Sequence, residues 1–158
     1  MAAQICETCE YRYEECYCSP NSTCKDYEPD AVIFNEINKY NSNLERIKAL
    51  RTFMSGDNEN VPIHDRSLDE MRFLVEQCAE LGIPQPEIFP WAGGDGVQAE
   101  WEYDWYIEIN ISSRGVEALL LKEHDYKNAI ECKFDNALNA ILLVKEFITH
   151  VVDLEGTR

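Results

Sequence analysis

Five of the seven cysteines lie within the first 24 residues, at spacings that suit a metal ion. Cys6 and Cys9 have the two-residue spacer that lets two thiolates bind one tetrahedral zinc ion, which takes four ligands in a structural site. The predicted ligands are Cys6, Cys9, Cys18 and Cys24, with Cys16 as the spare thiol, and Cys16 can equally replace Cys18. The competing interpretation is a tail of free thiols, because the spacing is less regular than in a standard zinc ribbon.

The cellular compartment follows from the same cysteines and from the absence of long apolar runs. The opening MAAQICETCE contains no apolar core of signal-peptide length, and the apolar run at residues 140–144 is far shorter than a bilayer span. We therefore expect a cytoplasmic protein with no membrane partner, in which thiols stay reduced and metal binding outranks disulfides. Cys78 and Cys132 lie in apolar patterns and are expected in the core.

Catalytic patterns are missing from the sequence. His64, His124 and His150 are scattered, and none has the spacing of a metal site or of a nucleophile and its base. Glu100 and Glu108 could act as a general acid and a general base, so a hydrolase is the remotest of the alternative functions. Solvated strand faces commonly carry glutamate, so the sequence predicts a protein that is not an enzyme.

Acidic side chains dominate the composition and define the expected partners. Thirty acidic against fourteen basic side chains give a net charge of -16, which opposes binding to phosphate backbones. Residues 67–126 hold thirteen of the acids and three bases, whereas residues 31–66 hold five of each. The sequence therefore predicts a basic protein as partner and no direct nucleic acid.

The expected partner surface combines acids with aromatic side chains, which are enriched in binding hot spots. Its predicted residues are Glu100, Glu102, Tyr106 and Glu108 on strands, with Asp69, Glu76 and Glu80 on a helix. Such a surface presents carboxylates where the basic groove of a nucleic-acid-binding protein expects phosphates. The alternative is that the acids only keep the protein in solution.

Two helices are expected before the strands. Apolar positions recur at the helical period over residues 31–54, which predicts one amphipathic helix, or two that are interrupted near residues 41–43. A second helix is predicted from the capping box of Ser67 and Glu70 to Gly82, with Pro84 just beyond it. Residues 84–96 are predicted to form an extended linker that leads into a sheet.

A four-stranded antiparallel meander is expected next, because apolar and polar residues alternate from Val97 onward. Two strands lie on either side of residues 103–104, a turn at residues 112–115 leads to a third over residues 116–121, and a fourth spans residues 128–133. A last helix is predicted from Asp135 as N-cap, packed on the sheet. The predicted core residues are Trp101, Trp105, Ile107, Ile109, Leu138, Ile141, Leu142 and Ile148.

The predicted class is therefore α+β, with an N-terminal zinc knuckle, two helices, the meander and a C-terminal helix. The predicted segments are residues 1–30 for the cysteine-rich part, 31–83 for the helices and 84–158 for the sheet and last helix. Residues 31–158 are expected to form one domain.

Two segments resemble parts of other proteins. The stretch GVQAEWEYDWYIEINISSRGVEALLL resembles a strand module of uncharacterised bacterial and phage proteins. CETC followed by CSPNSTCKDYEPD resembles the cysteine-rich leaders of proteins from Gram-positive phages and mobile elements. These resemblances imply an origin and an architecture but no reaction, so no catalytic residue is carried over.

The predicted function is that of an acidic inhibitor or interaction protein, of phage or mobile-element origin, that blocks a host nucleic-acid-binding defence protein through its basic groove. The alternative is a zinc-knuckle adaptor that binds nucleic acid or protein. The first 30 residues contain seven acids against Arg12 and Lys25, which disfavours phosphate binding by the knuckle. The sequence leaves the oligomeric state open.

Overall fold

The computed structural model describes residues 28–52, 54–55, 61–123 and 125–156, and it is α+β as predicted. Contacts divide the chain into two compact units, residues 1–37 and 38–158, and all packing described below belongs to the second. The helices are α1 (Glu28–Leu50), α2 (Asp65–Leu81), the 3-10 turn η1 (Tyr126–Asn128) and α3 (Ala137–Gly156). The strands are β1 (Met54–Ser55), β2 (Val61–Pro62), β3 (Glu87–Pro90), β4 (Val97–Glu102), β5 (Trp105–Ser112), β6 (Gly115–Lys122) and β7 (Ile130–Phe134). No helix among these residues has the length and apolarity needed to cross a membrane.

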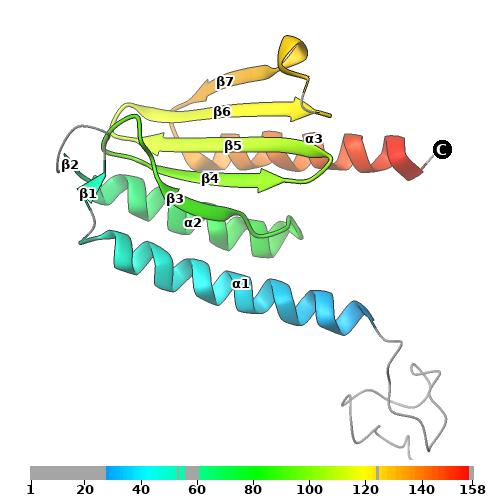
Figure 1. Ribbon diagram of the computed structural model, residues 1–158, viewed down its shortest axis with the longest axis horizontal. Helices are drawn as coiled ribbons and strands as arrows, with labels where there is room; N and C mark the ends of the chain where they lie inside the picture. The colour runs from blue at the N-terminus through cyan, green and yellow to red at the C-terminus, as the bar shows by residue number, and fades with distance from the viewer. Residues whose placement is uncertain (1–27, 53, 56–60, 124, 157–158) are drawn as a thin grey trace, which may run out of the picture. The chain divides into compact units, whose positions relative to one another are not determined.

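The main sheet is an antiparallel meander of five strands in the order β3-β4-β5-β6-β7 (Figure 1). The prediction of four strands was wrong because β3 comes from the segment expected to be a linker. Ile88 faces the core while Glu87 is exposed, so the short strand follows the two-residue period despite its proline. The predicted end of the first helix at residue 54 was also wrong, since α1 ends at Leu50 and Met54 pairs with Pro62.

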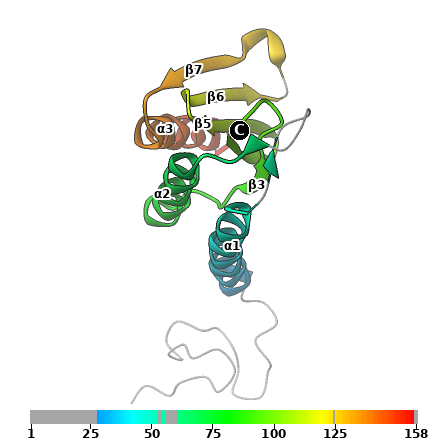
Figure 2. The ribbon, with the colours of Figure 1, turned by 90° about the vertical axis from the view of Figure 1, so that its left-hand side faces the viewer.

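Helices α2 and α3 contact the same face of the sheet, which we call the inner face (Figure 2). Every second residue of β4 and β5 is buried there, and Trp101 also donates a hydrogen bond from Nε1 to the Pro84 carbonyl at 2.6 Å. The alternating residues point to the other face, which we call the outer face. In β4 and β5 these outer residues are half-buried or exposed.

The helix ends differ from the predicted caps in an informative way. Helix α2 begins two residues before Ser67, with His64 as N-cap and its Nδ1 accepting from the Arg66 amide, so Ser67 lies buried inside the helix. Glu70 instead accepts a hydrogen bond from the Ala137 amide at 2.8 Å, which joins α2 to the start of α3. Gly82 ends α2 as predicted, with a φ of 67° that favours glycine.

The end of the sheet leads into α3 one residue later than predicted. Asn136, not Asp135, provides the side-chain oxygen that accepts a hydrogen bond from the amide of Asn139. Such a bond satisfies one of the amides that has no partner within the first turn of a helix. The cap has therefore moved by one position along the chain.

Two of the predicted core residues were wrong. Leu138 is 42% exposed and Leu142 is 49% exposed, while Ile141 between them is fully buried. Helix α3 buries a different stripe, because smaller side chains at Ala137 and Ala140 lie against its neighbours. The predicted core residues of the sheet are buried, namely Trp101, Trp105, Ile107 and Ile109. Ile148 is partly buried and packs against the core.

Candidate functional site: an acidic outer sheet face

A row of glutamates crosses the outer face at one level of the sheet. The register places Glu87 of β3 opposite Glu100 of β4, and Glu100 opposite Glu108 of β5. The row continues through Leu119 of β6 to Glu131 of β7. We call these five residues the acidic row. Like charges placed directly opposite each other destabilise a sheet, so folding alone does not favour this arrangement.

Tyr106 links two members of the acidic row, Glu100 and Glu108. Its hydroxyl lies 2.8 Å from Glu100 Oε1 and 2.9 Å from Glu108 Oε2, and the single phenolic proton serves both carboxylates. Burial, followed by the hydrogen bonds and negative charge of the two carboxylates, raises the pKa of Tyr106 above the ordinary value of a phenol. The hydroxyl is therefore a neutral donor at physiological pH.

Two amide side chains complete this polar network. Gln98 donates from Nε2 to Glu100 Oε1 at 2.7 Å, and Asn110 donates from Nδ2 to Glu108 Oε1 at 2.5 Å. The opposite oxygen of the Asn110 amide is buried without a hydrogen-bond partner. Donors thus fix the two carboxylates in place without cancelling their charge, which leaves a preorganised acceptor surface.

The ends of the acidic row differ in charge balance. Lys39 of α1 lies 2.9 Å from Glu87, so that end is paired. Glu131 has no ion-pair partner among the residues that the structure describes. Beside it, Lys133 lies 2.9 Å from Glu117. A shallow depression of about 450 Å³ opens here, with a lining that includes Glu108, Asn110, Glu117, Leu119, Glu131 and Lys133.

The predicted partner residues fall into two separate groups. The network joins Glu100, Tyr106 and Glu108, and Glu102 is exposed opposite Tyr106 in the register. The three predicted acids of α2 belong to a helix packed on the inner face, so the structure does not bring them to the acidic row. These are Asp69, Glu76 and Glu80.

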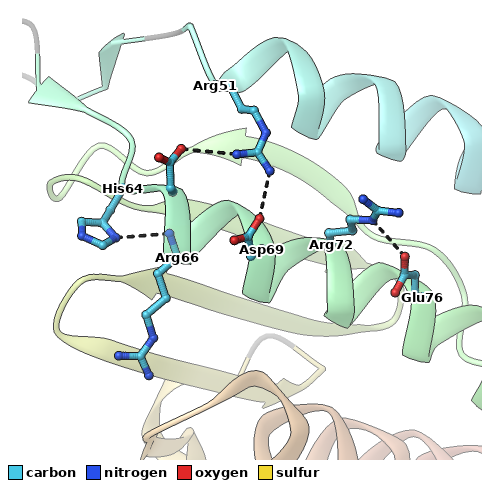
Figure 3. Close-up of polar contacts among 7 residues, drawn as sticks. Arg51, His64, Arg66, Asp69, Arg72 and Glu76 are labelled. Carbon is cyan, nitrogen blue, oxygen red and sulfur yellow. Dashed lines mark hydrogen bonds and ion pairs between the residues drawn. The ribbon is translucent and has the colours of Figure 1, made fainter.

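The three predicted acids of α2 each have a basic or amide neighbour, and Figure 3 shows two of these acids, Asp69 and Glu76. Arg51 lies 2.9 Å from Asp69 and 3.3 Å from Asp65, and Arg72 lies 3.0 Å from Glu76 (Figure 3). Gln77 donates to Glu80 at 3.0 Å. This side of the molecule therefore carries a mixed-charge surface, in contrast to the acidic row.

Sequence reasoning missed Glu87, Glu131 and the apolar member of the acidic row, Leu119. Glu131 follows the two-residue period of the fourth predicted strand, but only the register shows that it lies level with Glu108. Glu87 was missed because β3 was taken for a linker.

Comparison with protein-family models, with curated proteins and with solved structures finds no match to this chain.

A second hollow of about 520 Å³ lies at the end of the sheet where the β5–β6 turn meets the start of α3, and Trp91 and Arg114 are among its lining.

Asp95 fixes the nearby 91–96 turn through two hydrogen bonds. Its side chain accepts from the Ser113 amide at 3.2 Å, and its backbone carbonyl accepts from the His64 amide. Burial favours a higher pKa for Asp95, but the Ser113 hydrogen bonds and the His64 charge outweigh it and lower the pKa. A Cβ on Gly96 would lie 2.4 Å from the Ile111 carbonyl oxygen, so this position requires glycine.

The network around Tyr106 leads to a prediction about stability. Tyr106→Phe removes the shared donor and leaves Glu100 and Glu108 facing each other, which we expect to cost about 1 kcal/mol of unfolding free energy at pH 7. The cost should shrink at high salt, which screens the repulsion between the two carboxylates. Tyr126→Phe is the control, because Tyr126 is 71% exposed. Urea unfolding at low and at high salt measures the difference, and a cost that is equal at both would contradict the shared-donor role.

The predicted zinc ligands lie outside the described residues, so zinc binding stays a prediction. Among the described residues, no group of three or more His, Cys, Asp or Glu side chains is placed to hold a metal ion. Elemental analysis of protein purified without added metal is expected to find about one zinc per chain. Cys6→Ser together with Cys9→Ser should abolish the bound zinc, whereas Cys16→Ser or Cys18→Ser alone should retain it, because either of these two thiols can complete the site. Metal-free wild-type protein would show that the five thiols serve another purpose.

Proposed function

We propose that the chain is an acidic interaction protein that docks the outer face of its sheet onto a basic protein surface. The observation that carries this proposal is the acidic row, in which like charges face each other across neighbouring strands. Local rules of stability are commonly broken at functional sites, where binding compensates for the strain. A basic partner would supply the missing counter-charges and relieve the repulsion between Glu100 and Glu108.

The occupant of this face is proposed to be the nucleic-acid-binding groove of a host defence protein. Such grooves present rows of arginine and lysine that normally contact phosphates. The fixed carboxylates offer acceptors to the same side chains, and Tyr106 and Leu119 add aromatic and apolar contact between them. In this proposal the protein acts in the cytoplasm as an inhibitor encoded by a phage or mobile element, and it occupies the groove without catalysis.

The two separated groups of acids provide a matched test of the proposal. Three baits are compared in affinity capture from a bacterial lysate: the wild type, the sheet variant E100K/E102K/E108K and the helix variant D69K/E76K/E80K. The two variants change the net charge equally. A specific partner should be held by the wild type and the helix variant at low salt and lost by the sheet variant. Equal capture by all three baits would refute the outer face as the docking surface.

A further inference from the structure

The two edges of the main sheet differ in how they are protected. The β3 edge is four residues long, ends in Pro90, and adjoins α1, where Lys39 pairs with Glu87 and Asn43 donates to the Pro86 carbonyl. The β7 edge has five residues and no proline. In the described part of the chain, no strand pairs with the edge of β7 that faces away from β6. An open edge of this kind presents unpaired backbone groups to another strand.

The sequence of β7 is complementary to itself when two copies run antiparallel. With Cys132 on the twofold axis, Glu131 of one copy lies opposite Lys133 of the other, and this pair occurs twice. The same register places Ile130 opposite Phe134. Ile130 is 44% exposed and Phe134 is half-buried, so pairing would cover apolar surface on the inner face.

We propose that β7 pairs with β7 of a second copy, in the antiparallel register centred on Cys132. The five strands of each copy then form one continuous sheet. Opposite charges and apolar side chains directly across an antiparallel pair both stabilise it. The net charge of -16 on each chain opposes association, so the dimer is expected to be weak and reversible.

This pairing uses the strand edge and does not depend on the proposed function. The pairing nevertheless affects the proposed function, because side chains of alternate residues stay on the same face when two sheets are joined at their edges. The outer faces of the two copies would lie side by side, and the acidic rows would approach each other at Glu131. The dimer would thus present two copies of the acidic face to one partner.

A charge-swap series on the full chain tests the pairing. Light scattering and sedimentation across the micromolar range should show the mass of the wild type rising from 18.3 kDa toward twice that value. K133E places like charges opposite each other at both symmetric positions, and it is expected to weaken association about tenfold. The double variant E131K/K133E restores opposite charges in the swapped order and should recover the dimer.

The control is K122E, which makes the same charge change at an exposed residue of β6, away from the edge. It should leave association unchanged. A wild type that stays monomeric throughout the range would overturn the proposal. So would a double variant that associates no better than K133E, because the register alone predicts the rescue.

Discussion

Reversing Glu100, Glu102 and Glu108 to lysine is expected to slow association with the captured partner at least tenfold at low salt. Charge complementarity steers encounter between proteins, so removing it acts mainly on the association rate. The fold should persist, because all three side chains lie on the outer face, away from the core. Surface plasmon resonance measures the rates, and circular dichroism checks the fold.

Salt provides the internal comparison for this prediction. Exposed charges are screened beyond about 8 Å at physiological ionic strength, so added salt should slow wild-type association strongly and affect the sheet variant little. The helix variant D69K/E76K/E80K should retain the wild-type rate and salt dependence. If the sheet variant kept both as well, the acidic row would serve solubility alone.

Replacing Ile109 by alanine is expected to lower the free energy of unfolding by about 2–5 kcal/mol. Ile109 is fully buried in the middle of β5, between β4 and β6, so its truncation leaves a cavity that the flanking strands hold open. Leu142→Ala provides the contrast, because Leu142 is 49% exposed. It should change stability by about 0.5 kcal/mol or less.

Urea denaturation followed by linear extrapolation measures both effects. The contrast matters because the sequence predicts both residues in the core, Ile109 from the two-residue period of its strand and Leu142 from the helical period. Equal losses for the two variants would mean that Leu142 is buried and that α3 presents a different face to the sheet.

The strands could be predicted from the sequence because alternation reports directly on burial. Val97, Trp105 and Gly115 begin strands at or next to the predicted positions, and each buried residue of β5 follows the two-residue period. The exposure of Leu138 and Leu142 could not be predicted in this way. A broad apolar stripe on a helix does not say which part of it meets a neighbour, and only packing against the sheet decides that.

The candidate site was predictable only in part for a similar reason. Alternation placed Glu100 and Glu108 on one face, but the register that sets them opposite each other depends on pairing across the 103–104 turn. The α2 acids were grouped with them through charge alone, and charge carries no information about which side of the sheet a helix covers. Glu131 entered the row through two further strand pairings that no local pattern encodes.

Competition with nucleic acid tests the central claim most directly. The captured partner is bound to a labelled DNA duplex, and the wild-type protein, the sheet variant and the helix variant are each titrated against the complex. If the acidic row occupies the nucleic-acid-binding groove, the wild type and the helix variant should displace the duplex, and the sheet variant should require at least tenfold more protein. Formation of a ternary complex, in which the duplex stays bound while the wild type binds, would contradict the claim.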